Sequence, residues 1–113
     1  AFFGSRASAV LKAGGEVHIV SSRSPESRLE TAAELRDLSI KYSALYLLPP
    51  ISAAQEMCPH ANLDWFQRHV WLKVAYALEH DLVCFVDDDP KVLALFGRFA
   101  PRIAVLRGSG LAM

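Results

Sequence analysis

Two hydrophobic periodicities alternate along the chain. Apolar residues three and four positions apart are typical of helices, and short apolar or β-branched runs are typical of buried strands. The helical spacing occurs in 3–11, 24–38, 63–78 and 89–99. The strand-like runs are 16–21, 44–48, 82–86 and 102–106. Residues 49–62 have no clear period and are predicted to form a loop.

Local signals indicate where these helices begin and end. Gly14-Gly15 ends the first predicted helix, and Ser24-Pro25 begins the second with an oxygen-bearing cap followed by proline. Asn62 or Asp64 can cap the third helix. In the second helix, the apolar residues expected to face the core are Leu29, Ala32, Ala33, Leu35 and Leu38.

Strands that alternate with helices of this length predict an α/β fold. Such connections favour a Rossmann-like, doubly wound parallel sheet with helices on both faces. Ligand sites in these sheets lie at the carboxyl ends of the strands. In this chain those ends carry Ser21-Ser22-Arg23, Pro49-Pro50 and Asp87-Asp88-Asp89.

The composition indicates one neutral domain. The chain has 113 residues, 52% of them hydrophobic, with 12 basic and 12 acidic side chains. A nucleic-acid partner is not expected, because an electrostatic binder needs a basic excess. No apolar run is long enough to span a membrane, and no secretory signal is visible. Two cysteines, Cys58 and Cys84, are too few for a disulfide framework, which favours a reducing, cytoplasmic location.

The three consecutive carboxylates at 87–89 are the strongest chemical signal. Adjacent like charges are costly unless a cation lies among them. Their hard oxygen ligands, with no Cys/His cluster beside them, point to Mg²⁺ and not to zinc. The alternative is structural: Asp89 caps the next helix and its neighbours face solvent.

Two further features are weaker when taken alone. Ser21, Ser22 and Arg23 lie between a strand and a helix, where a hydroxyl and free amides can hold a phosphate oxygen. Turns of this composition are also common without a ligand. Lys73 lies at the edge of the third helix's apolar stripe. It either extends out of the core into solvent or serves as a cation that neutralises phosphate and carboxylates together.

Taken in this order, the three features resemble the later motifs of haloacid dehalogenase-type (HAD) phosphohydrolases. The segment Val17–Arg23 is similar to the second motif, Lys73 to the third, and Phe85–Pro90 to the fourth. The positions Arg28, Thr31 and Leu35 resemble a helix of the nucleotidase and polynucleotide-phosphatase branches. The resemblance extends over roughly residues 4 to 107.

The resemblance implies a site and a chemistry. Ser21 and Lys73 would be the catalytic phosphate contacts, with Ser22 and Arg23 beside them in substrate binding. Asp88, with Asp87, would hold Mg²⁺. The complete enzyme would hydrolyse a small phosphomonoester, and Ser21, Lys73 and Asp88 are expected around one concavity at the carboxyl edge of the sheet.

The family's first motif is absent from this sequence. That motif is a strand ending in Asp-x-Asp and supplies the nucleophile, whereas no aspartate precedes Asp37 here. We therefore expect residues 1–113 to be one HAD-like domain that is incomplete at its N-terminus and inactive as it stands. The missing strand would lie between the strands ending at Ser21 and Asp87. Its absence would leave backbone groups and apolar side chains exposed, favouring self-association.

Two other functions stay open. One is a non-catalytic HAD-like domain that binds or regulates. The other is a receiver-like phosphoacceptor domain, which also has clustered acids on a doubly wound sheet. Receivers carry the acid pair after the first strand and a lysine near the end, whereas here Lys73 precedes the acids.

Overall fold

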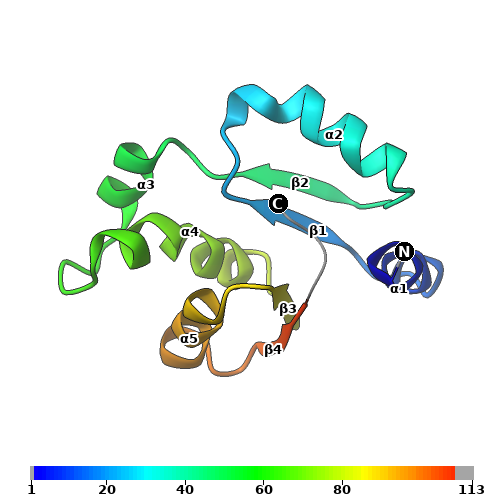
Figure 1. Cartoon of the computed structure of the whole chain (residues 1–113). Coiled ribbons are helices and arrows are strands. Elements are labelled where there is room, and N and C mark those ends of the chain that lie inside the picture. The colour runs from blue at the N-terminus through cyan, green and yellow to red at the C-terminus, as the bar shows by residue number, and fades with distance from the viewer. Residues whose placement is uncertain (1, 109–113) are drawn as a thin grey trace. The chain divides into compact units, whose positions relative to one another are not determined.

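The computed structural model describes residues 2–108 and divides into two compact units, at residues 1–48 and 49–113 (Figure 1). The elements of the first unit are α1 (Phe2–Lys12), β1 (His18–Ser21), the 3₁₀ turn η1 (Pro25–Ser27), α2 (Arg28–Asp37) and β2 (Ala44–Leu47). Those of the second unit are α3 (Ile51–Met57), α4 (Trp65–Glu79), β3 (Cys84–Asp87), α5 (Pro90–Phe99) and β4 (Ala104–Arg107).

Helix α1 ends where the sequence predicts. Gly14 has a positive φ of 84°, and the N–H groups of Gly14 and Gly15 donate to the carbonyls of Leu11 and Val10. This is a Schellman motif, which satisfies carbonyls left open at a helix end. A Cβ on Gly15 would lie 2.8 Å from Val10 Cγ1, so the close approach of the chain favours glycine there.

The first unit is built on a parallel strand pair. β1 pairs with β2 in a register that runs from His18 opposite Ala44 to Ser21 opposite Leu47. The connection between them passes through α2, as expected for a parallel crossover. Both strands therefore end at the same edge, and Ser21 is the last residue of β1.

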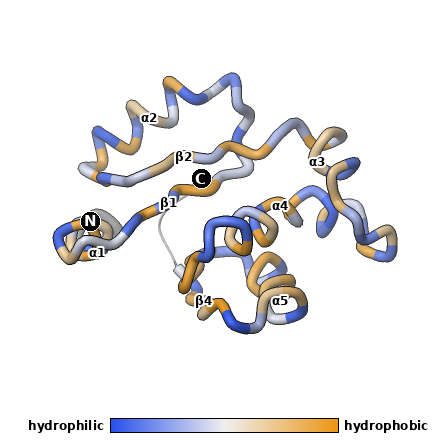
Figure 2. Tube along the Cα trace, turned by 180° about the vertical axis from the view of Figure 1, so that it is seen from behind, coloured by the Kyte–Doolittle hydropathy of each residue, from blue (hydrophilic) through white to orange (hydrophobic). Residues whose placement is uncertain are grey.

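The inward face of α2 differs from the predicted one. Leu29 is 86% exposed and Leu38 is also exposed, whereas Thr31 and Leu35 are fully buried. The segment begins as a 3₁₀ turn, in which the Ser24 hydroxyl accepts from the Glu26 N–H, and the α-helix starts only at Arg28. Leu29 precedes Thr31 by two positions, about 200° around the helix, and so faces away from the core. Figure 2 shows hydrophilic and hydrophobic residues mixed along α2.

The prediction of a loop over residues 49–62 is wrong, because α3 forms within it. The helix packs against α4, and Ala54 at its centre is completely buried. Hydrogen bonds join the two: Gln55 donates to the Trp65 carbonyl, and Arg68 donates to the Gln55 carbonyl. Tertiary contacts of small side chains therefore stabilise a short helix that has little amphipathic pattern.

Helices α4 and α5 carry the core of the second unit. Asp64 caps α4 in a capping box, with its side chain accepting from the Gln67 N–H at 2.7 Å. α5 packs against α4, β3 and β4, and Phe85 of β3 stacks on Phe96 of α5 with ring centroids 4.4 Å apart. The most buried apolar side chains here are Val70, Val74, Ala77, Val92, Leu95 and Phe96.

The second unit also contains a parallel pair, in which several apolar side chains are exposed and every residue of β4 is exposed. β3 and β4 run in register from Cys84 opposite Ala104 to Asp87 opposite Arg107. Val86 and Leu106 lie opposite each other in that register and are 40% and 53% exposed. Phe85, on the other face, is buried. Apolar side chains are thus exposed on this sheet.

The described strands form two separate two-stranded sheets. The α/β class and the parallel pairing are therefore confirmed, and the single doubly wound sheet stays a prediction. Within residues 2–108 no helix combines the length and apolar character needed to cross a membrane.

Candidate functional site

A buried ion pair lies at the carboxyl end of β3. Lys73 Nζ is 3.0 Å from Asp87 Oδ2, and the two side chains are only 7% and 8% exposed. The sequence left open whether Lys73 reaches solvent or a carboxylate. The structure shows that it is buried against the first aspartate of the acidic run.

The local sequence explains why these two groups meet. Asp87 follows Phe85 by two positions, so both lie on the face of β3 against which the helices pack. α4 leads into β3 through a short turn and therefore runs back along the strand. This topology brings residues in the middle of α4, including Lys73, toward the carboxyl end of β3.

The loop after Asp87 is held by carboxylate hydrogen bonds. Asp87 Oδ1 accepts from the Asp89 N–H at 2.9 Å, and Asp89 Oδ1 accepts from the Lys91 N–H at 2.9 Å. Asp89 is the N-cap of α5, which confirms the structural alternative for this residue. Asp88, between them, is exposed.

Asp87 and Asp88 suit Mg²⁺ in the chemistry of their donors. Carboxylate oxygens are hard ligands, and Mg²⁺ commonly takes one or two of them together with water and substrate phosphate. Asp87 Oδ2 accepts from Lys73, and Asp87 Oδ1 accepts from the Asp89 N–H. Each carboxylate oxygen has a second lone pair with which it can contact a metal ion. No group of three or more His, Cys, Asp or Glu side chains suited to a metal occurs within the described part of the chain.

His69 lies one turn before Lys73 on α4. Burial of its imidazole, helped by the positive charge of Lys73, lowers the pKa of His69 below its ordinary value. His69 is therefore biased toward its neutral form beside the ion pair. The sequence shows that His69 lies four residues before Lys73, but it does not show that His69 is on the partly buried side of α4.

The carboxyl end of β1 carries the second group of candidates. Ser21 is fully buried, and its hydroxyl accepts from the Arg23 N–H at 3.1 Å. Ser22 is exposed. The serine oxygen thus closes a turn of its own backbone, and Ser21 and Ser22 differ completely in their access to solvent.

Arg23 is held by a carboxylate that sequence reasoning did not single out. Its two terminal nitrogens contact Glu34 Oε2 and Oε1 at 2.6 and 3.2 Å. This bidentate hydrogen bonding raises the pKa of Arg23 and, together with the arginine charge, lowers the pKa of Glu34. Arg23 also reaches the buried Thr31 hydroxyl at 3.5 Å. No sequence motif pairs residues 23 and 34, because the contact depends on how α2 packs beside β1.

Arg28 has a structural contact across the first unit. Its guanidinium donates to the Leu45 carbonyl at 2.9 Å and so connects the start of α2 to β2. The three positions resembling the nucleotidase and polynucleotide-phosphatase helix therefore have defined places: Arg28 bonds to the strand, and Thr31 and Leu35 are buried.

The structure brings the predicted residues together within each unit. Ser21, Ser22 and Arg23 follow one another at the end of β1, and Lys73, Asp87 and Asp88 gather at the end of β3. Because the two groups belong to different units, a single concavity holding Ser21, Lys73 and Asp88 stays a prediction.

These features define an α/β protein with a buried lysine–aspartate pair at the end of a parallel strand. A scan against protein-family models and searches of curated proteins and of solved structures found no match to the chain.

Proposed function

We propose that this chain is part of a Mg²⁺-dependent phosphomonoester hydrolase of HAD type. The observation that carries the proposal is the buried Lys73–Asp87 pair at the carboxyl end of β3. The pattern of a lysine on a helix, followed by an acidic pair after the next strand, is that of the family's third and fourth motifs. A charged pair here is poorly explained by stability, because burying two charges often costs as much as their attraction returns.

Each residue has a role in this proposal that follows from its chemistry. Lys73 supplies a fixed positive charge that neutralises both Asp87 and the oxygens of a transferring phosphoryl group. Asp88 is exposed beside Asp87 and, with it, would hold Mg²⁺, which reduces the repulsion between an attacking carboxylate and the phosphate. At the end of β1, Ser21 would contact phosphate once its turn to the Arg23 N–H opens.

Hydrolysis also needs a nucleophile that this sequence does not contain. In the family, an aspartate attacks phosphorus and displaces the ester alcohol, whose oxygen is protonated by a neighbouring acid; water then hydrolyses the aspartyl phosphate and releases inorganic phosphate. The attacking group is a carboxylate because it forms an intermediate that can be hydrolysed. Ser21, Lys73, Asp87 and Asp88 orient and neutralise charge, and none of them replaces that nucleophile.

The test compares this chain with a longer protein that includes whatever residues precede Ala1 in its gene. We expect the longer protein to hydrolyse p-nitrophenyl phosphate with Mg²⁺, and the 113-residue chain to be inactive. Asp88→Asn in the longer protein should weaken Mg²⁺ binding and slow turnover together. Asp81→Asn is the matched control, because Asp81 is an exposed carboxylate of the same unit and asparagine tolerates its φ of 51°.

A second function, binding or regulation without catalysis, is favoured by the hydrogen bonds that the polar groups of the candidate site make within the chain. The Ser21 hydroxyl is buried in its own turn, and both oxygens of Asp87 accept hydrogen bonds from this chain. A HAD-like domain that binds or regulates without catalysis would have this property. Inactivity of the longer protein over a panel of phosphate esters with Mg²⁺ would contradict the hydrolase and support this alternative.

A further inference from the structure

Arg23 follows the end of β1, and its side chain reaches back along α2. Its guanidinium contacts the Thr31 hydroxyl and the Glu34 carboxylate. α2 runs from the carboxyl end of the strand pair toward its amino end (Figure 1). Glu34 lies six residues beyond the first residue of α2, which is about 9 Å along the helix axis. The Arg23 side chain is therefore directed away from the carboxyl edge, where Ser21 ends the strand.

The contact between Arg23 and Glu34 has the geometry in which arginine holds a phosphate. Two terminal nitrogens of Arg23 meet the two carboxylate oxygens at 2.6 and 3.2 Å. Arginine binds phosphate with the same fork of parallel hydrogen bonds. The pKa of Arg23 is raised and the pKa of Glu34 is lowered by this contact, so both side chains are charged at neutral pH. Glu34 thus occupies two donors with which Arg23 would hold a phosphate group.

The same arginine closes the turn that buries Ser21. The Arg23 N–H donates to Ser21 Oγ at 3.1 Å, while the Arg23 side chain lies against α2. The Thr31 hydroxyl, which is fully buried, lies 3.5 Å from Arg23 Nη1 and 3.5 Å from Ser27 Oγ. The backbone of Arg23 therefore holds the turn closed in the conformation in which its guanidinium is held by Glu34.

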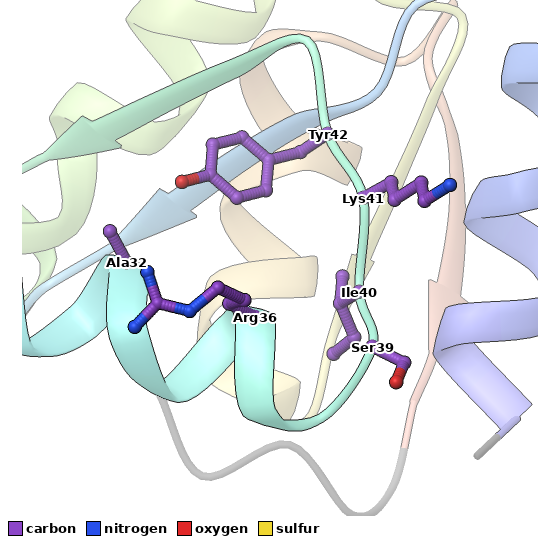
Figure 3. Close-up of a pocket in the computed structure, with 6 residues that line it drawn as sticks. All are labelled: Ala32, Arg36, Ser39, Ile40, Lys41 and Tyr42. Atoms are coloured by element: carbon purple, nitrogen blue, oxygen red, sulfur yellow. The ribbon is translucent and has the colours of Figure 1, made fainter.

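A second arginine of α2 lies on a different face of the helix. Arg36 lines an open depression at the end of α2 together with Ala32, and its guanidinium extends toward Ala32 (Figure 3). Glu34 is two positions from each of them, about 200° around the helix, and does not line the depression. The Glu34 carboxylate is therefore directed toward Arg23 and not toward the arginine nearer in sequence.

We infer that Glu34 is an internal competitor for phosphate at Arg23 and so sets the phosphate affinity of the β1 end. The inference rests on the proposed function, in which Ser21 and Arg23 contact the substrate phosphate. The side chains of Arg23 and Glu34 are 28% and 50% exposed, so a phosphate can reach the pair from solvent. Binding exchanges one anion for another on the same fork of donors. The measured affinity is lowered by the fraction of chains in which Glu34 holds the guanidinium.

The experiment titrates the ¹⁵N-labelled 113-residue chain and its Glu34→Gln variant with inorganic phosphate, and NMR follows the amide signals of residues 21–23. Glutamine preserves the size of the side chain and removes its charge. We expect Glu34→Gln to bind phosphate at least about fivefold more tightly than the parent chain, because the ion pair no longer competes. The Arg23 amide should shift most on binding, since its hydrogen bond to Ser21 Oγ is lost.

Two variants separate this competition from a general effect of charge. Glu30→Gln is the matched control, because Glu30 is an exposed carboxylate of the same helix whose charge acts on Arg23 through space. It should change the phosphate affinity less than about twofold, since exposed charges are screened. Arg23→Gln added to Glu34→Gln should remove the gain in affinity, because the fork of donors is lost.

Three results would overturn the inference. Equal gains in Glu30→Gln and Glu34→Gln would mean that net charge alone sets the affinity. Weaker binding by Glu34→Gln would mean that Glu34 orients Arg23 for phosphate. Phosphate that leaves residues 21–23 of Glu34→Gln unshifted would remove the ligand from this end of β1.

The proposed hydrolase is tested separately, by turnover of the longer protein. Turnover of that protein, with equal phosphate affinity in Glu34→Gln and the parent chain, would reject the internal competitor and leave the hydrolase standing. A gain of affinity in Glu34→Gln without turnover of the longer protein would support the competitor and reject the hydrolase.

Discussion

Replacing Lys73 by methionine tests the buried ion pair directly. Methionine preserves the unbranched apolar stem of lysine and removes its charge, so the substitution leaves the Asp87 carboxylate buried without its cation. The side chains of Lys73 and Asp87 are 7% and 8% exposed, so water replaces little of the lost interaction. Removing one partner of a buried pair typically costs about 3–5 kcal/mol.

We expect Lys73→Met to lower the free energy of unfolding by about 3 kcal/mol. This is the lower end of that range, because Asp87 keeps its hydrogen bond from the Asp89 N–H. For a chain of this size the loss corresponds to a fall in Tm of roughly 10 °C. The double variant Lys73→Met/Asp87→Asn removes both charges and should be more stable than Lys73→Met alone. The two substitutions are therefore strongly non-additive.

Urea unfolding followed by tryptophan fluorescence measures these differences. Both tryptophans, Trp65 and Trp71, lie on α4, so the signal reports on the unit that contains the pair. Lys91→Met is the matched control, because Lys91 is exposed and its ammonium lies 5.3 Å from the centre of the Phe66 ring. If Lys73→Met cost no more than Lys91→Met, the argument from a buried charge pair would be refuted.

Three further predictions concern the remaining supports of the fold. Asp64→Ala should lower the free energy of unfolding by about 1 kcal/mol through loss of the α4 capping box, measured by the same fluorescence assay; an unchanged urea midpoint would contradict the cap. The pKa of His69 is lowered in the folded state, so the unfolded chain takes up its proton first as pH falls through 6.5 and stability decreases. His69→Gln should therefore lose less stability than the parent between pH 7.5 and 5.5 in urea titrations, and an identical loss would disprove the coupling. Leu35→Ala should cost about 2–5 kcal/mol, and Leu29→Ala, at an exposed position, within about 0.5 kcal/mol, both followed by circular dichroism; equal costs would mean that the assignment of the buried face of α2 is wrong.

The elements that the sequence predicted well carry strong local signals. Gly14-Gly15, Asp64 and Asp89-Pro90 each mark a helix end, and all three act there in the structure. These signals depend on hydrogen bonds between neighbours in sequence, so they can be recognised without knowledge of packing. The parallel crossovers were predictable from the alternation of strands and helices along the chain, which favours parallel pairing.

The failures concern packing at a distance. α3 forms because it packs against α4 with Ala54 buried between them. One small buried residue gives no hydrophobic period from which the helix could be predicted. The buried face of α2 is set by the 3₁₀ turn that precedes it, which shifts Leu29 outward and Thr31 inward. Both depend on three-dimensional fit, which hydrophobic spacing alone does not encode.

The candidate site was likewise predictable only in part. The sequence indicated that Ser21 and Asp87 lie at strand ends and that Lys73 lies on a helix, but it left open whether Lys73 reaches solvent or a carboxylate; the structure places it against Asp87. The Arg23–Glu34 pair was not predictable, because eleven residues and a change of element separate its members. Contacts between elements set such pairs, whereas strand ends are visible as the point where an apolar run stops.

The buried polar groups at the ends of β1 and β3 have different explanations. Ser21 is satisfied by the Arg23 N–H within its own turn, so its burial needs no explanation beyond local structure. The Lys73–Asp87 pair is different, because two charges are withdrawn from water where an apolar pair of similar volume would often be as stable. Asp88, exposed beside that pair, adds a carboxylate to a position where the fold already places opposite charges in contact. The proposed phosphate and metal chemistry therefore depends on β3 and α4, and Ser21 would contact phosphate only after the turn at residues 21–23 opens.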